Sequence, residues 1–390
     1  MPGIKNRVAI VGVGATKFGE HWDKDQEDLL IEAVYDAYED AGITQDEIQA
    51  GWVGAFYNFT GLAGATAAEP LKLFGRPVTR VENFCASGMD AFRNACYGVA
   101  SGVYDIVLAC GVEKIMDQGA RGLPGVGEIG HPIFGSVSAP GMFALAATRC
   151  FEKHGWTKSD LAQVAIKNHQ NGVEHPKAHF RKPVNENQVI SAPIIAYPLG
   201  RFDCCAISDG AAALILTRPE IAERMKRKDD YVAVRASALA IESSFPMFKL
   251  SYDYLGFPAT QKAARMAYEE AAIKDPRKEI SFAEVHDCFT ITEILNYEDL
   301  GFCKKGEGVK FLRDGVPMPE GELPVNISGG LKCFGHPIGA TGCRMLYEVT
   351  KQLQIRADGR QVKNPRLGLA HNLGGPGSVC SVTILGRHDV

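Results

Sequence analysis

Long apolar runs, a secretion signal and an excess of positive charge are all missing from this sequence of 390 residues. No apolar run approaches the roughly 20 residues that a membrane-spanning helix needs. Residues 1–7 show no apolar region followed by a small-residue cleavage site, which a secretory signal would have. The formal net charge is −4, so no basic surface for nucleic acid is indicated. We therefore expect a cytoplasmic protein that binds neither a membrane nor nucleic acid.

The Cys-x-x-C spacing typical of zinc ribbons is also missing, although the chain has 11 cysteines. Without a secretion signal these cysteines should remain thiols, and most of them should be small, buried apolar residues. His169, His175 and His179 lie near one another in the sequence, but in a loop without residues placed to orient them as ligands. We therefore expect no metal site.

A dinucleotide-binding motif is incomplete near the start of the chain. Gly12 and Gly14 end a short apolar run, which is typical of a buried strand that enters a loop. The third glycine of the motif is missing, and no acidic residue follows in a matching strand–helix context. We therefore expect no permanently bound nucleotide cofactor.

Alternating strand and helix patterns run through the chain twice. In the first half, residues 77–84 and 105–112 have the apolar character of buried strands, and residues 89–102 between them have helical periodicity. Strand, helix and strand in this order predict a βαβ unit. The second half repeats the plan in weaker form over the ranges 231–235, 260–272, 341–355 and 367–385.

The stretch from residue 113 to 202 differs in composition from both halves. It is rich in Gly, Pro, Asn and His, with helical periodicity near 139–154 and 161–172. A regular strand pattern resumes at 211–217. We interpret the stretch as an insertion into the first of two similar α/β halves.

Cys85 lies between a predicted strand and a predicted helix. This position places its thiol near a helix N-terminus, where the partial positive charge favours the thiolate. The small neighbours Ala86, Ser87 and Gly88 leave room for a substrate beside it. Cys85 is therefore a candidate nucleophile. The alternative is a small apolar residue that fills a tight turn.

Three further motifs hold residues suited to acid–base or oxyanion chemistry. His336 stands in a rigid Gly-His-Pro turn before a helix, which suits a general base, although a histidine that caps the helix is the alternative. The sequence His-Asp-Cys-Phe at 286–289 follows a predicted strand, a position typical of active-site edges in α/β folds. Residues 371–377 form a glycine-rich turn that can present backbone N–H groups to an oxyanion. For the last two motifs a purely structural turn is the alternative.

Taken together, these four segments resemble the thiolase superfamily over essentially the whole chain. The Cys-Ala-Ser-Gly motif at 85–88 and the Gly-His-Pro-Ile-Gly motif at 335–339 look like the family's nucleophile and catalytic-histidine loops. The His-Asp-Cys-Phe motif narrows the resemblance to the branch of sterol-carrier-protein-2-type and archaeal-type thiolases.

The resemblance implies an α/β class thiolase fold with five layers in the order αβαβα. Such a fold is built from two similar halves with an inserted loop domain. On this basis we expect residues 1–118 together with 203–230 to form the N-terminal half, residues 119–202 the inserted loop domain, and residues 231–390 the C-terminal half.

The resemblance also implies roles for the site residues. Cys85 would attack the acyl thioester, and His336 would activate it. The family's second catalytic cysteine normally opens the final glycine-rich motif, where this chain has His371. In the branch that this chain resembles, the cysteine of the His-Asp-Cys-Phe motif takes over this role, so the resemblance implies Cys288 as the candidate acid and base. His286 would help to bind the thioester oxygen.

A second oxyanion hole is implied by the same resemblance. The backbone N–H groups of Cys85 and Leu373 would form it, within a glycine-rich active-site loop that also contains His371, Asn372, Gly374 and Gly375. The implied activity is thiolytic cleavage or Claisen condensation of a 3-oxoacyl-CoA through an acyl-cysteine intermediate. Coenzyme A and acyl-CoA are substrates, and the chemistry needs neither a metal nor a permanently bound cofactor.

Two other functions remain open. A protein of this fold can pass the acyl group to a carbon acceptor that is not CoA, or it can be a non-catalytic lipid-binding or scaffold subunit of an acyl-CoA complex. Cys85, His336 and Cys288 together argue against the scaffold. Similar proteins form homodimers and often work with a small zinc-ribbon and OB-fold subunit, as in two-subunit thiolases of the benzoylsuccinyl-CoA type. We expect both kinds of partner here.

Overall fold

The computed structural model describes residues 3–57, 63–119, 138–244 and 246–389. Residues 120–137, which belong to the predicted inserted region, lie outside the described residues. Within the described residues, nine strands form one continuous sheet in the order β3-β2-β4-β7-β1-β8-β11-β10-β9. A separate hairpin pairs β5 with β6.

The first five strands of this order form the sheet of the N-terminal part. They are β1 (Ala9–Ala15), β2 (Ala50–Gly54), β3 (Val78–Val81), β4 (Ile106–Glu113) and β7 (Gly210–Thr217). β2 runs parallel to β3 and β4, whereas β7 runs antiparallel to β4 and β1. β4 and β7 are buried along nearly their whole length because helices cover both faces of the sheet.

The other four strands form the sheet of the C-terminal part. They are β8 (Val232–Ile241), β9 (Phe282–Val285), β10 (Leu367–Gly374) and β11 (Val379–Arg387). β10 and β11 form an antiparallel pair, and β9 runs parallel to β10. β1 meets β8 through two residue pairs, Ala9 with Ala233 and Ile10 with Val232. The two sheets are therefore joined along a short seam.

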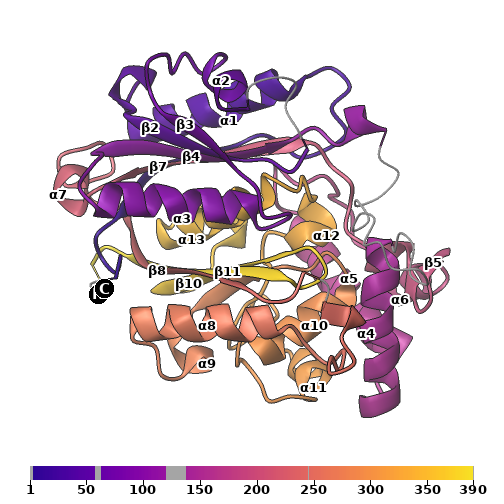
Figure 1. Cartoon of the computed structure of the whole chain (residues 1–390). Coiled ribbons are helices and arrows are strands. Elements are labelled where there is room, and N and C mark those ends of the chain that lie inside the picture. The colour runs from indigo at the N-terminus through magenta and orange to yellow at the C-terminus, as the bar shows by residue number, and fades with distance from the viewer. Residues whose placement is uncertain (1–2, 58–62, 120–137, 245, 390) are drawn as a thin grey trace.

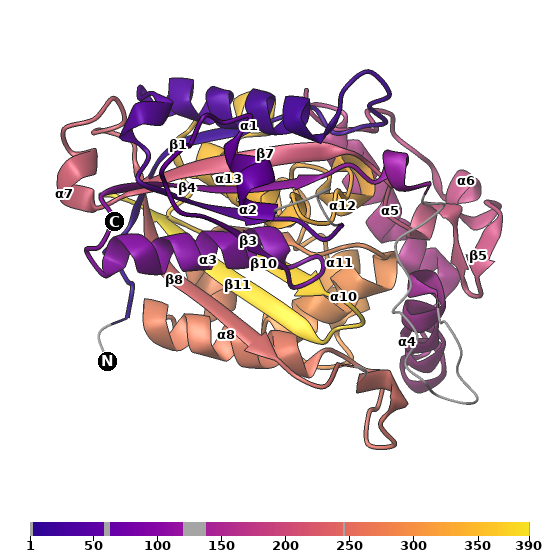
Figure 2. The same ribbon diagram turned by 45° about the horizontal axis from the view of Figure 1, so that its top comes forward.

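Helices lie outside both sheets and between them. Figure 1 shows α1 and α2 over the first sheet, α3 and α13 between the sheets, and α8 and α10 under the second sheet. Figure 2 shows the same layers from a tilted direction. The bounds are α1 (Gln26–Ala41), α2 (Ala63–Ala68), α3 (Ser87–Ala100), α8 (Pro258–Ala271), α10 (Thr290–Asp299) and α13 (Thr341–Leu353). This arrangement confirms the predicted five-layered αβαβα architecture.

The start of α1 illustrates how local sequence sets a boundary. The side chain of Asp25 accepts the N–H groups of Glu27 and Asp28, and at the other end Gly42 has a φ of 73°, in the left-handed region. These are the usual signals that begin and end a helix. The helix therefore begins directly after Asp25 and ends directly before Gly42.

The two central helices approach closely where glycines remove side chains. A Cβ atom at Gly342 would lie 2.3 Å from the backbone nitrogen of Met89, and one at Gly88 would lie 2.4 Å from the carbonyl oxygen of Gly339. Both distances are too short for any other residue without displacement of backbone. The glycines thus bring the first turns of α3 and α13 together.

The inserted region packs against the C-terminal part. It contains α4 (Ala139–His154), α5 (Lys158–Gly172), α6 (Glu186–Ile190), β5 (Ile194–Ala196) and β6 (Leu199–Gly200), and its first two helices confirm those predicted. Lys167 of α5 forms a buried ion pair with Glu293 of α10 at 2.8 Å. The side-chain amide of Asn168, also in α5, donates to the carboxylate of Asp287 at 2.8 Å. The insertion therefore contacts the segment that carries the His-Asp-Cys-Phe motif.

Short helices complete the described chain. They are α7 (Pro219–Ala222), α9 (Pro276–Glu279), α11 (Gly308–Arg313), α12 (Gly330–Phe334) and the 3₁₀ turns Gln45–Glu47, Met116–Gln118, Arg201–Asp203, Pro246–Phe248 and Asp358–Arg360. None of the helices in the described ranges has both the length and the apolar character needed to cross a membrane.

Candidate active site

Cys85 lies at a sharp turn between β3 and α3. Phe84, just before it, has a φ of 52°, in the left-handed region, which costs a residue other than glycine about 1–3 kcal/mol. The Ser87 hydroxyl holds this turn, because it donates to the carbonyl oxygen of Phe84 and accepts the N–H of Asn83 at 2.9 Å. A strained strand-to-helix turn of this kind is typical of residues that present a nucleophile.

His336 faces the thiol of Cys85, with 3.2 Å between Nε2 and Sγ. The other ring nitrogen, Nδ1, lies 2.6 Å from the Oγ1 of Thr341, and this hydroxyl donates to the carbonyl oxygen of Pro337 at 2.8 Å. Because the hydroxyl proton is engaged by Pro337, Thr341 accepts the proton on Nδ1. Nε2 therefore keeps its lone pair and can accept the proton of the thiol.

The imidazole of His286 lies beside that of His336. Its ring centroid is 5.2 Å from that of His336, with the two rings in a T-shaped arrangement. The Nδ2 of Asn372 donates to the Nδ1 of His286 at 3.1 Å, so the ring proton is on Nε2. His286 is thus an N–H donor that is suited to bind a carbonyl or enolate oxygen.

Cys288 lines the same cavity as Cys85 and His286. Its buried Sγ lies 3.7 Å from the Oγ1 of Thr292, one turn into α10. The remaining walls of the cavity are mostly apolar and are made by Phe84, Ala139, Met142, Phe143, Phe289 and Ile338. The structure therefore places two thiols and an imidazole around one apolar space.

In the part of the chain that the structure describes, three helices begin beside these residues. Cys85 precedes α3, Cys288 precedes α10, and His336 precedes α13. The first turn of each helix has N–H groups without helical partners and a partial positive charge. The fold therefore directs the positive ends of three helices toward the place where negative charge would develop.

Burial keeps the thiol and the imidazoles uncharged in the resting state. It raises the pKa of Cys85 to about 12, although the N–H groups of Gly375 and of Cys85 itself lower that pKa. Burial, with a smaller effect of Arg344, lowers the pKa of His336 to about 3. Burial and the neighbouring His336 also hold the pKa of His286 well below its usual value. These shifts favour a neutral thiol beside a neutral imidazole as the resting pair.

The glycine-rich motif differs from the predicted turn. Its first four residues belong to β10, which pairs with β11 through Gly374, so the turn begins only at Gly375. His371 is buried away from the cavity. Its Nδ1 accepts the N–H of His286 at 3.3 Å, and its Nε2 lies 3.0 Å from the Oγ1 of Thr260. His371 thus holds β9, β10 and α8 together.

The other residues of this motif differ in whether they line the cavity. Asn372 orients His286 from behind, and Leu373 is buried opposite Cys380 in the β10–β11 ladder. Gly375, with a φ of 60°, lines the cavity, and its N–H is directed at the thiol of Cys85. The backbone donor nearest the thiol in this motif is therefore Gly375, two residues beyond the predicted Leu373.

Three other histidines each contact a separate partner. His169 Nδ1 lies 3.1 Å from the carbonyl oxygen of Lys182, His175 Nε2 lies 3.0 Å from Glu348, and His179 Nδ1 lies 2.8 Å from the Ser208 hydroxyl. These contacts give each of them a structural role, away from the cavity that Cys85 lines.

Two family models match the chain in succession. The model of the thiolase N-terminal domain matches residues 8–220, and the model described as thiolase C-terminal domain-like matches residues 244–387. The chain belongs to the thiolase family. Its motifs at 85–88, 286–289 and 335–339 thus led to the correct family.

Individual relatives of this thiolase-family chain agree with that assignment. An acetyl-CoA acetyltransferase of Methanothermobacter thermautotrophicus is 40% identical over 389 residues, which cover 97% of this chain and 99% of that one. The benzoylsuccinyl-CoA thiolase subunit BbsB of Thauera aromatica is 33% identical over 378 residues, with 95% and 96% covered. The solved structure of an Ltp2-ChsH2(DUF35) aldolase matches with a TM-score of 0.85 at 24% identity and covers 98% of both chains. This last match shows the shared fold.

Glu113 supports the thiolase site but is not singled out by any sequence pattern. It is buried at the end of β4 and accepts the N–H groups of Phe56, Tyr57 and Gly339 at 2.9, 3.0 and 2.9 Å. Burial raises its pKa to about 7, against the effect of these three donors. Glu113 therefore fixes the loop that carries His336 to the end of the central strand β4.

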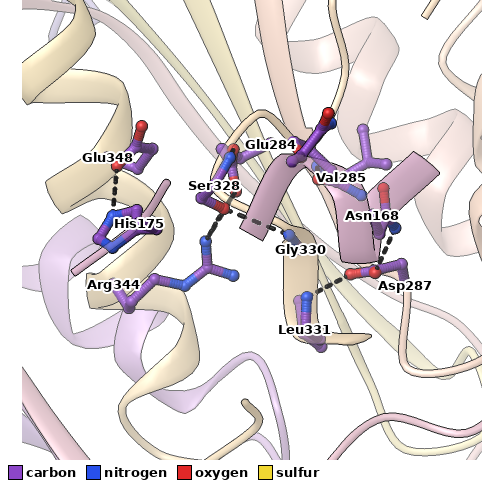
Figure 3. A network of polar contacts seen from close by, with 12 residues as sticks. Asn168, His175, Glu284, Val285, Asp287, Ser328, Gly330, Leu331, Arg344 and Glu348 are labelled. Atoms are coloured by element: carbon purple, nitrogen blue, oxygen red, sulfur yellow. Dashed lines mark hydrogen bonds and ion pairs between the residues drawn. The ribbon is translucent and has the colours of Figure 1, made fainter. Parts of the chain in front are cut away.

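A buried polar network joins Glu284 in β9, two residues before His286, to α13 (Figure 3). The carboxylate of Glu284 accepts from the Nη1 of Arg344 at 2.7 Å and from the hydroxyl of Ser328 at 2.6 Å. The positive charge of Arg344 adds to the effect of burial in lowering the pKa of both His286 and His336. The network thus favours neutral imidazoles at the site.

The carboxylate of Asp287 is directed toward Leu331, in α12 (Figure 3). Its carboxylate accepts the N–H groups of Leu331 and Lys332 at 2.6 and 3.2 Å and the side-chain amide of Asn168 at 2.8 Å. The acidic residue of the His-Asp-Cys-Phe motif therefore anchors the segment, while the residues on either side of it line the cavity.

Proposed function

We propose that this chain is a CoA-dependent thiolase that cleaves or forms a 3-oxoacyl-CoA through an acyl group carried on Cys85. The observation that carries this proposal is the 3.2 Å contact between Cys85 Sγ and His336 Nε2, with the tautomer of His336 set by Thr341. The relationship to an acetyl-CoA acetyltransferase and to a benzoylsuccinyl-CoA thiolase subunit supports the same reaction class.

The first half of the cleavage reaction acylates Cys85. The thiol proton passes to His336 Nε2, and Sγ attacks the 3-oxo carbonyl carbon of the substrate. The bond between C2 and C3 then breaks, and its electron pair leaves as the enolate of the shorter acyl-CoA. The N–H groups of Cys85 and Gly375 stabilise the oxyanion on the attacked carbon, and the N–H of His286 stabilises the enolate oxygen.

Cys288 donates the proton that the departing enolate needs. Burial holds the pKa of its thiol well above the usual value, so the thiol is protonated before the reaction, as an acid must be. In the second half-reaction free CoA enters, gives its thiol proton to the thiolate of Cys288 and attacks the acyl group on Cys85. The sulfur of Cys85 leaves and takes back the proton that His336 holds. The products are two acyl-CoA molecules, and the thiol of Cys85 is restored.

The walls of the cavity favour an apolar acyl group. Met142, Phe143 and Phe289 lie around the space that Cys85 faces, and the rings of Phe143 and Phe289 pack 4.8 Å apart. An acyl chain that replaces water between these residues gains about 25 cal/mol for each Å² of apolar surface that it buries.

Transfer of the acyl group to a carbon acceptor other than CoA would use the same acyl-cysteine. A non-catalytic scaffold would not need the contact of Cys85 with His336.

We also propose partners, a location and domain limits for this protein. A homodimer and a small zinc-ribbon and OB-fold subunit are proposed, in the cytoplasm. One relative is named as a subunit, and the name of one structural neighbour gives two components, which supports the small subunit. Co-purification with the products of neighbouring genes tests this subunit. If removal of the small subunit leaves the activity unchanged, a required role is excluded.

The proposed domains are residues 1–118 with 203–230, residues 119–202 and residues 231–390.

Intact mass spectrometry after incubation with acetyl-CoA or a 3-oxoacyl-CoA tests the proposed intermediate. The wild-type chain should gain one acyl group, and Cys85→Ser should gain none. Cys204→Ser is the matched control, because Cys204 is also a partly exposed thiol, and its adduct should equal that of the wild type. An adduct that persists in Cys85→Ser, or none in the wild type across several acyl-CoAs, would overturn the proposal.

A further inference from the structure

The ligand atoms of Cys85, His286 and His336 form a compact group of one sulfur and two nitrogens. They come from three separate segments of the chain, and all of them lie within 4.8 Å of one another. The side chains of the two histidines are buried, whereas Cys85 retains partial exposure toward the cavity. The proposed acyl transfer uses these atoms as nucleophile, base and hydrogen-bond donor. One sulfur and two nitrogen atoms placed so close together can also be the ligands of a metal ion.

One thiolate and two imidazoles are ligands that zinc and similar thiophilic divalent cations prefer. Tetrahedral zinc, with Zn–S of about 2.3 Å and Zn–N of about 2.0–2.1 Å, holds a sulfur and a nitrogen ligand roughly 3.5 Å apart. The 3.2 Å between Cys85 and His336 is close to this value. The three ligand atoms, which lie within 4.8 Å of one another, must move closer together for all of them to bind one ion. The fourth position is then left open on the cavity side.

His336 already has the tautomer that a metal requires. Its Nδ1–H is held by Thr341 at 2.6 Å, so the lone pair of Nε2 is directed at Cys85. Metal-bound histidines are usually held in this way, through a hydrogen bond from the nitrogen that does not bind the metal.

His286 needs one change, and Asn372 can accommodate it. In the resting arrangement the Nδ2 of Asn372 donates to Nδ1 of His286, while the Oδ1 of the same amide is buried without a hydrogen-bond partner among the described residues. Rotation of the amide by a half turn brings Oδ1 to that ring nitrogen. His286 can then carry its proton on Nδ1 and offer the lone pair of Nε2 to a metal.

We propose that the resting chain binds one thiophilic divalent cation of the zinc type through Cys85, His286 and His336, and that this cation inhibits it reversibly. The inhibitory consequence rests on the proposed function, because the metal takes the sulfur that would attack the thioester. The acylated chain is insensitive, since its sulfur is already in a thioester. Binding breaks the S–H bond of Cys85, forms a bond from sulfur to the metal and releases one proton to the solvent.

Cobalt(II) titration of the metal-free protein tests the site without any assay of activity. One equivalent should produce the visible absorption of a tetrahedral cobalt site together with a sulfur-to-cobalt charge-transfer band, and zinc should displace it. Cys85→Ser should lose the charge-transfer band. His286→Ala should weaken binding by more than about 100-fold, beyond the effect expected for an outer contact. Cys205→Ser removes a neighbouring thiol outside the set and should match the wild type.

Prior alkylation of Cys85 with iodoacetamide should also abolish the charge-transfer band, whether or not the chain acylates itself. A charge-transfer band that survives in Cys85→Ser, or equal cobalt affinity in the wild type and His286→Ala, would overturn the site. If the site binds cobalt while no acyl-CoA labels Cys85, the metal site stands and the proposed function fails. If zinc binds but leaves the rate of acylation unchanged, the inhibitory role is refuted.

Discussion

The hydroxyl of Thr341 lies 2.6 Å from the Nδ1 of His336, on the opposite ring nitrogen from the one that faces Cys85. The same hydroxyl donates to the carbonyl of Pro337 within the turn, so it has no proton to offer the ring. A residue in the first turn of α13 thus decides which nitrogen of His336 keeps a lone pair. On the proposed mechanism, Thr341 thus determines that Nε2 of His336 receives the proton from the thiol of Cys85.

Thr341→Val should slow acylation of Cys85 by roughly 10- to 100-fold, which is part of the 10²–10⁴ that a well-placed base contributes. The methyl group cannot accept the Nδ1 proton, so both tautomers of His336 become populated. Thr341→Ser keeps the hydroxyl and should remain within a few-fold of the wild type. Single-turnover acylation followed by mass spectrometry measures the effect, and equal rates for the Val and Ser variants would contradict it.

Alkylation of Cys85 by iodoacetamide should rise steadily with pH through the neutral range. The folded-state pKa of the thiol is raised to about 12, so the thiolate fraction is small near neutral pH and grows as the pH increases. A stable thiolate–imidazolium pair would behave differently, because its thiolate would already be formed at neutral pH. Rates measured by mass spectrometry over the pH series distinguish the two, and a plateau reached below neutral pH would rule out the neutral pair.

Cys288→Ala should separate the two kinds of chemistry. Loss of the proposed acid should slow cleavage and formation of the carbon–carbon bond by about 10²–10⁴, because the enolate then lacks its proton donor. Acylation of Cys85 from a simple acyl-CoA needs no enolate and should change little. Parallel assays of condensation and acyl labelling measure this, with Thr292→Ser as a control that keeps the hydroxyl beside Cys288. Equal losses in both assays would remove Cys288 from the acid–base role.

Gly342→Ala should destabilise the fold by about 1–3 kcal/mol or more, the usual cost of overpacking a core. The new Cβ would lie 2.3 Å from the backbone nitrogen of Met89, and only a shift of α13 against α3 can relieve this contact. Gly359→Ala is the matched control. In the described part of the chain a Cβ there meets no atom within 4 Å, so the change in stability should be less than about 0.5 kcal/mol. Urea denaturation of both variants measures the difference, and similar midpoints would show that the central helices are not tightly packed.

Much of the site follows from local sequence, because each motif combines a turn with the start of an element. Cys85, His336 and His286 all lie at such junctions, and the predicted helix at 139–154 has the bounds of α4. The five-layered order could also be predicted, because the motifs identify the thiolase family and members of this family share that order.

The remaining site residues depend on contacts between distant segments. Glu113 and Gly339 are 226 positions apart in the chain, and nothing near either residue indicates that one will accept the N–H of the other. The distinction between Leu373 and Gly375 depends on how far β10 continues along β11, because pairing through Gly374 delays the turn. Sequence periodicity does not specify that length, and strand boundaries are therefore harder to predict than helix starts.

The short seam between β1 and β8 has a consequence for how the protein is made. Cys85 comes from one side of that seam, whereas His286, Cys288 and His336 come from the other and are translated much later. A ribosome-bound fragment that ends before β8 carries the cysteine without its imidazole partners. On the proposed mechanism such a fragment is inert toward cellular thioesters, so chemical competence arises only in finished, fully docked molecules.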